Sequence, residues 1–249
     1  MKMGKLIRDS FLITKIILLN IRGRLALYLL SLFLLPLGIM FILFTFSTSQ
    51  TPESVMRIFS GTLVFALAMT GINDVGQGIT TERFTGAVNL YRTSPISPVS
   101  YILAVFFSSG IKNVLSAIVI LSIGVLVFPS YWHFSVLALS FLLLACCSFI
   151  GIGSVIGTRS RSIQEGLSLS NFLSLIVILL SPVYYDIESL PKLAQYFSLL
   201  LPTTHASQGM YLTFIGTYNI MTWCYLGGLI ISTVVLNFLG FAMVKWRET

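Results

Sequence analysis

The chain of 249 residues is 56% hydrophobic and 9% charged, and its mean hydropathy is +0.94. Soluble domains carry roughly 25% charged residues, so the composition excludes the soluble classes and indicates a polytopic helical membrane protein. The net charge of +7 does not indicate nucleic-acid binding, because the basic residues stand in short segments at the ends of apolar runs. We therefore expect an all-α fold in a membrane.

The first 24 residues combine basic and apolar positions. Six basic residues stand there against one acidic residue, Asp9: they are Lys2, Lys5, Arg8, Lys15, Arg22 and Arg24. Most of them fall near one face of a helix, while isoleucine and leucine occupy the rest. This pattern is typical of an amphipathic helix that lies on anionic membrane lipid. Residues 1–24 are predicted to form such an interfacial helix, with a frayed basic tail as the alternative.

Six apolar runs follow within the domain 25–249. They cover residues 25–46, 57–79, 101–128, 134–157, 167–185 and 221–244. A helix rises 1.5 Å per residue, so 22 residues cross a core of about 30 Å. Pro36 is expected to kink the first span, and the long third run is expected to tilt or to begin in the interface. The sequence thus predicts six transmembrane helices.

The distribution of charge predicts the orientation. On the side of the N-terminus the connecting segments carry twelve basic residues, whereas the opposite side carries two, Arg57 and Lys192. Basic residues are enriched on the cytoplasmic side of membrane proteins. The protein is therefore expected to lie in a cell membrane, with both termini on the cytoplasmic side.

The loop 80–100 is the most polar internal segment and falls on the cytoplasmic side. It holds Glu82 and Arg83, which we expect to begin a short helix, a break at Gly86, and a turn that runs from Ser94 to Pro98. A charged loop with its own helix between two spans favours a contact with a partner protein. The alternative is a loop that is merely solvated.

The segment 186–220 falls outside and is too long for a turn. Its apolar stretch 193–201 is too short to cross, Ser189 with Pro191 is a plausible helix start, and Pro202 ends the run. Thr203 or Thr204 is expected to cap a second short helix that reaches toward Phe214. Two re-entrant helices fit this pattern.

The sequence offers no catalytic set, no cofactor-binding motif and no metal site. A phosphate-binding loop is missing, because Gly4-Lys5 lacks the upstream glycine. The three cysteines are read as small packing residues. Gly153 and Gly157, four residues apart, predict close helix packing.

One charge pair is expected inside the membrane. Lys112 lies eleven residues into the third run, about 17 Å along its axis, and Asp74 is the only acidic residue within a predicted span. An unpaired ammonium there would cost roughly 3 kcal/mol, so we expect the two side chains to pair. If the third run begins in the interface, Lys112 instead reaches water alone.

Two stretches resemble a known family. The first is Glu82-Arg-Phe-Thr-Gly86 with Thr93-Ser-Pro-Ile-Ser97, and the second runs from Ser181-Pro-Val to Leu201-Pro-Thr-Thr. Together they are similar to type-2 permeases of ATP-binding-cassette (ABC) exporters, over essentially the whole chain. The chain departs from that pattern at Ala104-Val105, where the family often has Gly-Lys, and at Leu201, where it usually has Asn.

The resemblance implies a non-enzymatic subunit that works with a separate ABC ATPase, which would bind ATP and Mg. A second copy of the permease or a paralogue would complete the pore. The resemblance also implies a coupling helix in the loop 80–100, with the following residues in contact with the ATPase: Glu82, Arg83, Gly86, Arg92, Ser94 and Pro95. Spans two and five line the pathway in this family, which makes Asn73, Ser168, Asn171 and Ser174 pathway candidates.

Two other functions remain open at this point. An intramembrane enzyme is disfavoured, because no paired carboxylates, Ser-Lys pair or histidine-rich set occurs at matching depth. A scaffold or assembly factor that uses the same ATPase without transporting anything is the alternative to an exporter. The substrate is not fixed by these residues, although the apolar fifth span mildly favours a hydrophobic or amphipathic cargo.

Overall fold

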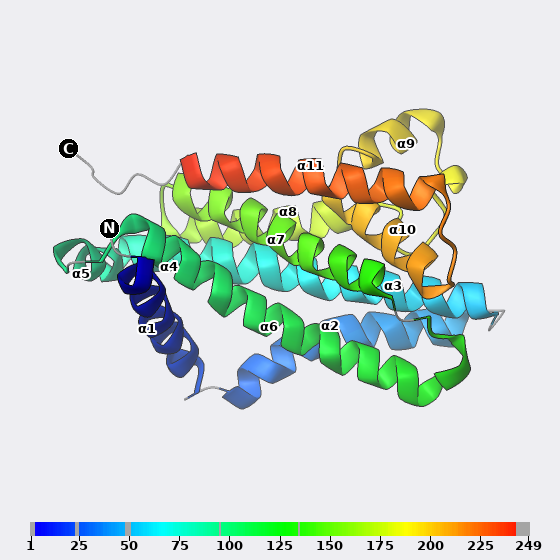
Figure 1. The fold of residues 1–249 in the computed structure, drawn as a ribbon, viewed down its shortest axis with the longest axis horizontal. Helices are drawn as coiled ribbons and strands as arrows, with labels where there is room; N and C mark the ends of the chain where they lie inside the picture. The colour runs from blue at the N-terminus through cyan, green and yellow to red at the C-terminus, as the bar shows by residue number, and fades with distance from the viewer. Residues whose placement is uncertain (1–2, 23–24, 48–50, 95, 134, 243–249) are drawn as a thin grey trace.

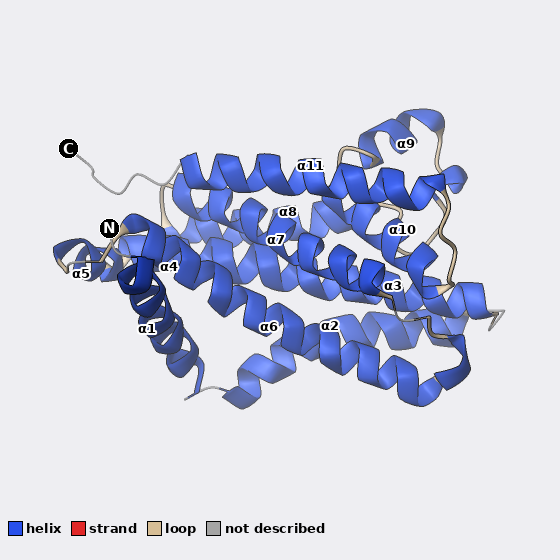
Figure 2. Cartoon of the chain, in the orientation of Figure 1, coloured by secondary structure: helices blue, strands red, loops and turns tan. Residues whose placement is uncertain are grey.

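The computed structural model describes all residues except 1–2, 23–24, 48–50, 95, 134 and 243–249. Most of the described residues are in helices, and none of them is in a strand (Figure 2). The elements are α1 (Met3–Arg22), α2 (Leu25–Phe46), α3 (Pro52–Ala68), the π-helix η1 (Met69–Asp74), α4 (Val75–Phe84), α5 (Ala87–Thr93), α6 (Pro98–Val127), the 3₁₀ turn η2 (Pro129–Tyr131), α7 (Val136–Arg159), α8 (Ile163–Leu179), the 3₁₀ turn η3 (Ile187–Ser189), α9 (Lys192–Ser198), α10 (Pro202–Phe214) and α11 (Ile220–Ala242).

The long helices run side by side along the longest axis of the molecule (Figure 1). The start of α1, the end of α11 and the whole of α5 lie at one end, which we call the termini end. The short helices α9 and α10 lie at the other, which we call the hairpin end. Helix α1 crosses the bundle obliquely and packs on α6, where Thr14 Oγ1 donates to the carbonyl of Ala104 at 3.3 Å.

Helix α1 has one face against the bundle and one face outward. Ile13 is buried against the bundle with 1% of its surface exposed, whereas Ile7 and Phe11 are 62% and 68% exposed. A helix with an outward apolar stripe and several basic residues is suited to lie in a membrane interface.

The second predicted span is longer than expected. Elements α3, η1 and α4 form one helical rod, Pro52–Phe84, of 33 residues. It begins five residues before the predicted start at Arg57, because Thr51 caps it by accepting from Ser54 N and Pro52 stands in its first turn. The polar residues around Glu53 are thus its first turn and not a loop.

Four helices are long and apolar enough to cross a membrane among the residues described: Pro52–Phe84, Val99–Val127, Val136–Arg159 and Ile220–Ala242. Two shorter apolar stretches accompany them, Phe33–Phe46 and Ile163–Leu179. The chain is therefore a multi-pass membrane protein, and the count of six spans stays a prediction.

Helix α8 differs from the predicted span 167–185. It begins earlier, at Ile163, because Ser162 caps it by accepting from Glu165 N, and it ends at Leu179. Its 17 residues reach about 26 Å, which is less than the roughly 30 Å of a bilayer core. The residues after Leu180 form bends and turns that lead into η3.

The segment 186–220 contains two short helices, as predicted, but their boundaries differ in one respect. Pro202 does not merely end the first helix; it is the first residue of α10. Thr203 therefore does not cap α10. Its side chain is buried in the chain, where it bonds to the Ser181 hydroxyl and to the carbonyl of Val177.

Small residues let three helices approach closely at the centre of the bundle. A Cβ placed on Gly153 of α7 would lie 2.6 Å from the Gly71 carbonyl oxygen, and one placed on Gly157 would lie 2.6 Å from Ile79 Cβ. The predicted packing through this glycine pair is confirmed. The same rod meets α8 at Gly166, where an added Cβ would overlap the side chain of Thr80.

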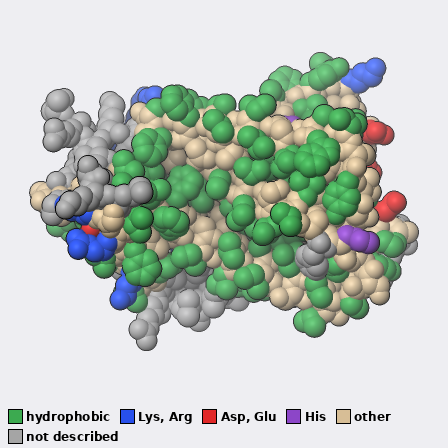
Figure 3. Space-filling view, in the orientation of Figure 1, with side chains coloured by type: hydrophobic (Ala, Val, Ile, Leu, Met, Phe, Trp, Pro, Cys, Tyr) green, Lys and Arg blue, Asp and Glu red, His purple; other side chains and the backbone are tan. Residues whose placement is uncertain are grey.

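Charges are divided between the two ends (Figure 3). Most of the lysine and arginine side chains visible there lie at the termini end, and most of the visible acidic side chains lie at the hairpin end, where one basic side chain also projects. Hydrophobic side chains cover the surface between them. This is the surface of a protein whose middle lies in lipid.

Candidate functional site

The loop between α4 and α6 forms a helical turn that extends from the termini end. Gly86 has φ +80°, the left-handed conformation that commonly ends a helix, and α5 begins at the next residue. Ser97 then caps α6 by accepting from Ser100 N at 3.1 Å. Helix α5 is therefore held between two defined helix ends, and its Leu90 side chain is 72% exposed.

Glu82 and Arg83 lie in the last turn of α4. The sequence suggested that they begin the short helix, and they do not. The prediction was wrong because it ended the second span at residue 79, whereas the helix continues to Phe84 and ends before the left-handed residue Gly86, where the break was expected. A carboxylate at this position gains nothing from the dipole of α5. Its role is instead set by what it contacts.

Both side chains tie α4 to its neighbours. The Tyr101 hydroxyl of α6, in a side chain that is 3% exposed, donates to Glu82 Oε2 at 2.6 Å. Arg83 Nη1 donates to the carbonyls of Gly157 and Ser160, at 2.7 and 3.2 Å, where α7 ends. A cation that satisfies the last carbonyls of a helix is favourably placed. The base of α5 is thus joined to three helices.

The remaining loop residues support this turn to different degrees. Tyr91 packs against Tyr101 with ring centroids 5.5 Å apart. Burial, together with the Glu82 carboxylate, raises the pKa of Tyr91 above its ordinary value. Ser94 Oγ donates to the carbonyl of Tyr91 at 2.8 Å. The side chain of Arg92 and all of Pro95 lie outside the described residues.

The structure brings Asp74 and Lys112 together. Lys112 Nζ lies 3.0 Å from Asp74 Oδ2, and the two side chains are 13% and 24% exposed. Asp74 is the last residue of the π-helix η1. An extra residue in a helical turn changes the direction of the side chains that follow it, and such turns are frequent at functional sites.

The pathway candidates divide between two faces of α8. Ser168 and Asn171 are exposed, and the Asn171 amide oxygen accepts from Gln77 Nε2 of α4 at 3.1 Å. Ser174 is fully buried and donates to the carbonyl of Asn171. Asn73 is half-buried on η1. The structure therefore joins Asn171 to Gln77, leaves Ser168 exposed, and buries Ser174 away from both.

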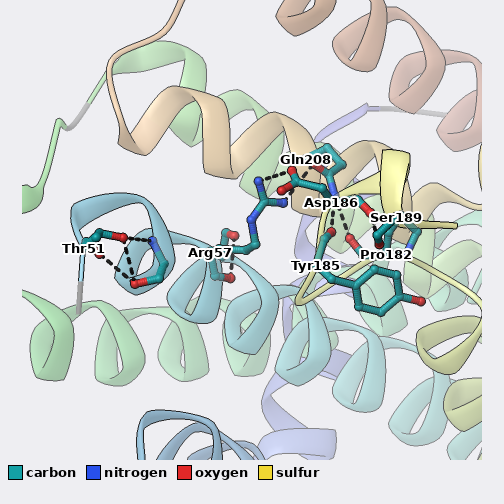
Figure 4. A network of polar contacts seen from close by, with 9 residues as sticks. Thr51, Arg57, Pro182, Tyr185, Asp186, Ser189 and Gln208 are labelled. Atoms are coloured by element: carbon teal, nitrogen blue, oxygen red, sulfur yellow. Dashed lines mark hydrogen bonds and ion pairs between the residues drawn. The ribbon is translucent and has the colours of Figure 1, made fainter. Parts of the chain in front are cut away.

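A polar network closes the hairpin end (Figure 4). Arg57 of α3 forms an ion pair with Asp186, its Nη1 lies 3.4 Å from Gln208 Oε1, and its guanidinium carbon lies 3.9 Å from the ring centroid of Tyr211. Gln208 Nε2 in turn donates to the carbonyls of Pro182 and Tyr185, at 2.7 and 3.1 Å. One arginine thus joins α3, α10 and the segment after α8.

Sequence reasoning missed this network and Gln77. The opposite charges of Arg57 and Asp186 in two outer segments were a signal that could have paired them. Gln77 carried a weaker signal, because it precedes the polar loop by only three residues and was counted as part of an apolar span. No local pattern pointed to Gln208.

The comparison with protein families identifies the family of the chain. Residues 10–215 match the model of the ABC-2 type transporter family. No curated protein matches the chain at a significant level. The family match covers more than half of the chain, so the protein belongs to the ABC-2 type transporters, whose membrane domain is a component of transport and is not itself catalytic.

Proposed function

We propose that this chain is the permease subunit of an ATP-driven exporter, and that it forms half of a translocation pathway. Membership of the ABC-2 family supports the transport role. The structure of the turn formed by α4, α5 and the start of α6 gives the proposal further support. It projects a short helix from the termini end and fixes its base to three other helices.

In this proposal the partner is a separate ATPase that binds ATP and Mg. Helix α5, with its exposed Leu90, binds to the surface of that ATPase. Movement of α5 is transmitted through the Glu82–Tyr101 contact to α6 and through the Arg83 contacts to α7. Rigid contacts of this kind transmit a displacement because packed helices move as units.

The pathway lies between this chain and a second copy or a paralogue. The contact between Gln77 and Asn171 supports this placement, because it puts two polar side chains, one half-buried and one exposed, at the surface of a single chain. Polar side chains inside a membrane usually face a protein interior or a water-filled cavity. A two-fold ATPase favours two permease chains around one axis. We expect the purified complex to contain two permease chains.

Removing a single hydroxyl tests the coupling. In Tyr101→Phe the side chain keeps its packing but loses its hydrogen bond to Glu82. We expect insertion into the membrane to stay normal, while the ATP hydrolysis that the permease stimulates in proteoliposomes with its ATPase falls several-fold. Gly86→Trp and Glu82→Ala should act in the same direction.

The matched control is Tyr196→Phe, whose ring is 70% exposed on α9 at the opposite end. This variant should hydrolyse ATP like the wild type. If Tyr101→Phe, Gly86→Trp and Glu82→Ala all behave like Tyr196→Phe, the loop does not couple the two proteins. The non-transporting scaffold then becomes the better account.

Cysteine labelling tests the orientation, with both ends of the chain in the cytoplasm. Ser160 is a poor labelling position because it is 2% exposed, so its exposed neighbour Arg161 is used. In a cysteine-free background, Arg161→Cys should react only after cells are permeabilised, and Tyr196→Cys should react on intact cells. The reverse pattern would overturn the proposed topology.

A further inference from the structure

A cavity of about 440 Å³ opens on the face that α6, α7 and α11 share, toward the termini end. These three helices lie on the near face of the molecule in Figure 1, with α8 behind α7. Pockets that hold small ligands have volumes of roughly 300–1,000 Å³ and mostly apolar walls. This cavity matches both properties, and Gln77 and Asn171 of the proposed pathway do not line it.

The mouth of the cavity is apolar and faces outward. Val234 and Phe241 of α11 line it and are 63% and 49% exposed, and Phe106 of α6 lies on the opposite wall. Hydrophobic side chains cover much of this face (Figure 3). The surrounding medium at this height is therefore lipid hydrocarbon. A lipid acyl chain that enters the cavity exchanges one apolar environment for another.

The inner wall carries a positive charge. Arg83 is the only charged residue among those that line the cavity. It forms no ion pair with any residue that the structure describes; its contacts are with the two carbonyls of α7 and the ring of Phe84. Guanidinium groups bind phosphate well, because they are always charged and present several donors in a fixed plane.

A second polar side chain lines the cavity. Asn237 of α11 also lines the cavity, and its Nδ2 donates to the carbonyls of Cys147 and Thr233. Its Oδ1 atom is buried and has no hydrogen-bond partner. A buried acceptor without a partner costs about 1–3 kcal/mol. Because this oxygen is enclosed, the Asn237 side chain has to rotate toward the cavity before a donor on a bound molecule can remove this cost.

We propose that the cavity binds one anionic phospholipid. An acyl chain fills the apolar space between α6 and α11, and the phosphate lies against Arg83. The lipid belongs to the leaflet on the side of the termini, which is the cytoplasmic leaflet if the orientation proposed above holds. Because Arg83 also anchors the base of α5, this lipid would contact the same helix ends that the ATPase is proposed to move.

The experiment measures retained lipid on the purified chain by native mass spectrometry, after passage through vesicles that contain equal amounts of palmitoyl-oleoyl phosphatidylglycerol and phosphatidylcholine. We expect the wild type to keep a single phosphatidylglycerol through delipidating detergent washes. Val234→Trp places an indole in the cavity and should abolish this retention. Val235→Trp, at an exposed neighbouring position outside the cavity, should not change it.

A second variant tests the headgroup. Arg83→Gln keeps one donor for the carbonyls of α7 but removes the charge, so the preference for phosphatidylglycerol over phosphatidylcholine should fall to about one. The ratio of the two lipids is measured within one sample and does not depend on the amount of folded protein. Loss of retention in both tryptophan variants or in neither, or equal retention of both lipids by the wild type, would overturn the proposal. These readouts require no ATPase, so they stand apart from the test of coupling.

Discussion

The Lys112→Met substitution tests how much the ion pair with Asp74 contributes to folding. In the wild type the Lys112 ammonium lies 3.0 Å from the Asp74 carboxylate, and the side chains of Lys112 and Asp74 are 13% and 24% exposed. The substitution removes the ammonium and leaves the carboxylate in this site. Removing one member of a buried pair costs about 3–5 kcal/mol, and a single charge at the centre of a membrane helix costs about 2.5–3.5 kcal/mol on insertion scales. Because Asp74 keeps some access to solvent, we expect a loss near 3 kcal/mol.

The assay is the free energy of unfolding in mixed micelles, determined for a double-mutant cycle. Asp74→Asn alone should destabilise the protein by a similar amount, and the double variant Asp74→Asn/Lys112→Met should be more stable than the sum of the single losses predicts, by about 1–3 kcal/mol. Exchanging the charges, as Asp74→Lys/Lys112→Asp, should recover part of the loss.

The matched control for this cycle is Lys15→Met on α1, because Lys15 is exposed and its replacement should change stability by less than about 0.5 kcal/mol. Two silent single variants, or losses that simply add, would show that Lys112 reaches water or another group on its own. The reasoning from burial and distance would then be refuted.

Three further predictions concern the hairpin end, the helix seam and the turn before α5. Arg57→Met removes an ion pair, a hydrogen bond and a ring contact. It should therefore lower the free energy of unfolding by about 2–4 kcal/mol. Lys192→Met, at an exposed position, is the control and should be near neutral in the same denaturation assay. Gly157→Ala should cost about 1–3 kcal/mol, because its Cβ would meet Ile79, while Gly110→Ala, with open space around it, should be neutral or stabilising by up to about 1 kcal/mol. Gly86→Ala forces a side chain into a left-handed conformation at φ +80°, so it should lower the free energy of unfolding by about 1–2 kcal/mol and should also lower stimulated ATP hydrolysis.

Several features of the fold follow directly from the sequence. The apolar runs, the amphipathic first helix and the two short helices of the segment 186–220 were all predictable, because each rests on local composition and periodicity. Gly153 and Gly157 predicted a close approach because a four-residue spacing puts both on one helix face. The proximity of Asp74 and Lys112 followed from an energetic argument, since a charge in a membrane requires a partner.

Other features depend on tertiary contacts that local patterns do not contain. The start of the second span at Pro52 was missed, because polar first-turn residues look like a loop unless the cap at Thr51 is recognised. The helical placement of Glu82 and Arg83 depended on which residue adopts the left-handed conformation. Arg57 and Gln208 are 151 residues apart in the sequence, so only the fold brings them together.

The central claim is that α5 is the surface on which an ATPase acts. Its most direct test compares two exposed leucines in short helices at opposite ends of the molecule, Leu90 of α5 and Leu193 of α9, which are 72% and 75% exposed. Each is changed to cysteine in a background without Cys146, Cys147 and Cys224 and is coupled to a short photoactivated cross-linker in the assembled complex. The account predicts that Leu90→Cys cross-links to the ATPase and that Leu193→Cys does not. Cross-linking from Leu193→Cys, or from neither position in a complex that still hydrolyses ATP, would contradict it.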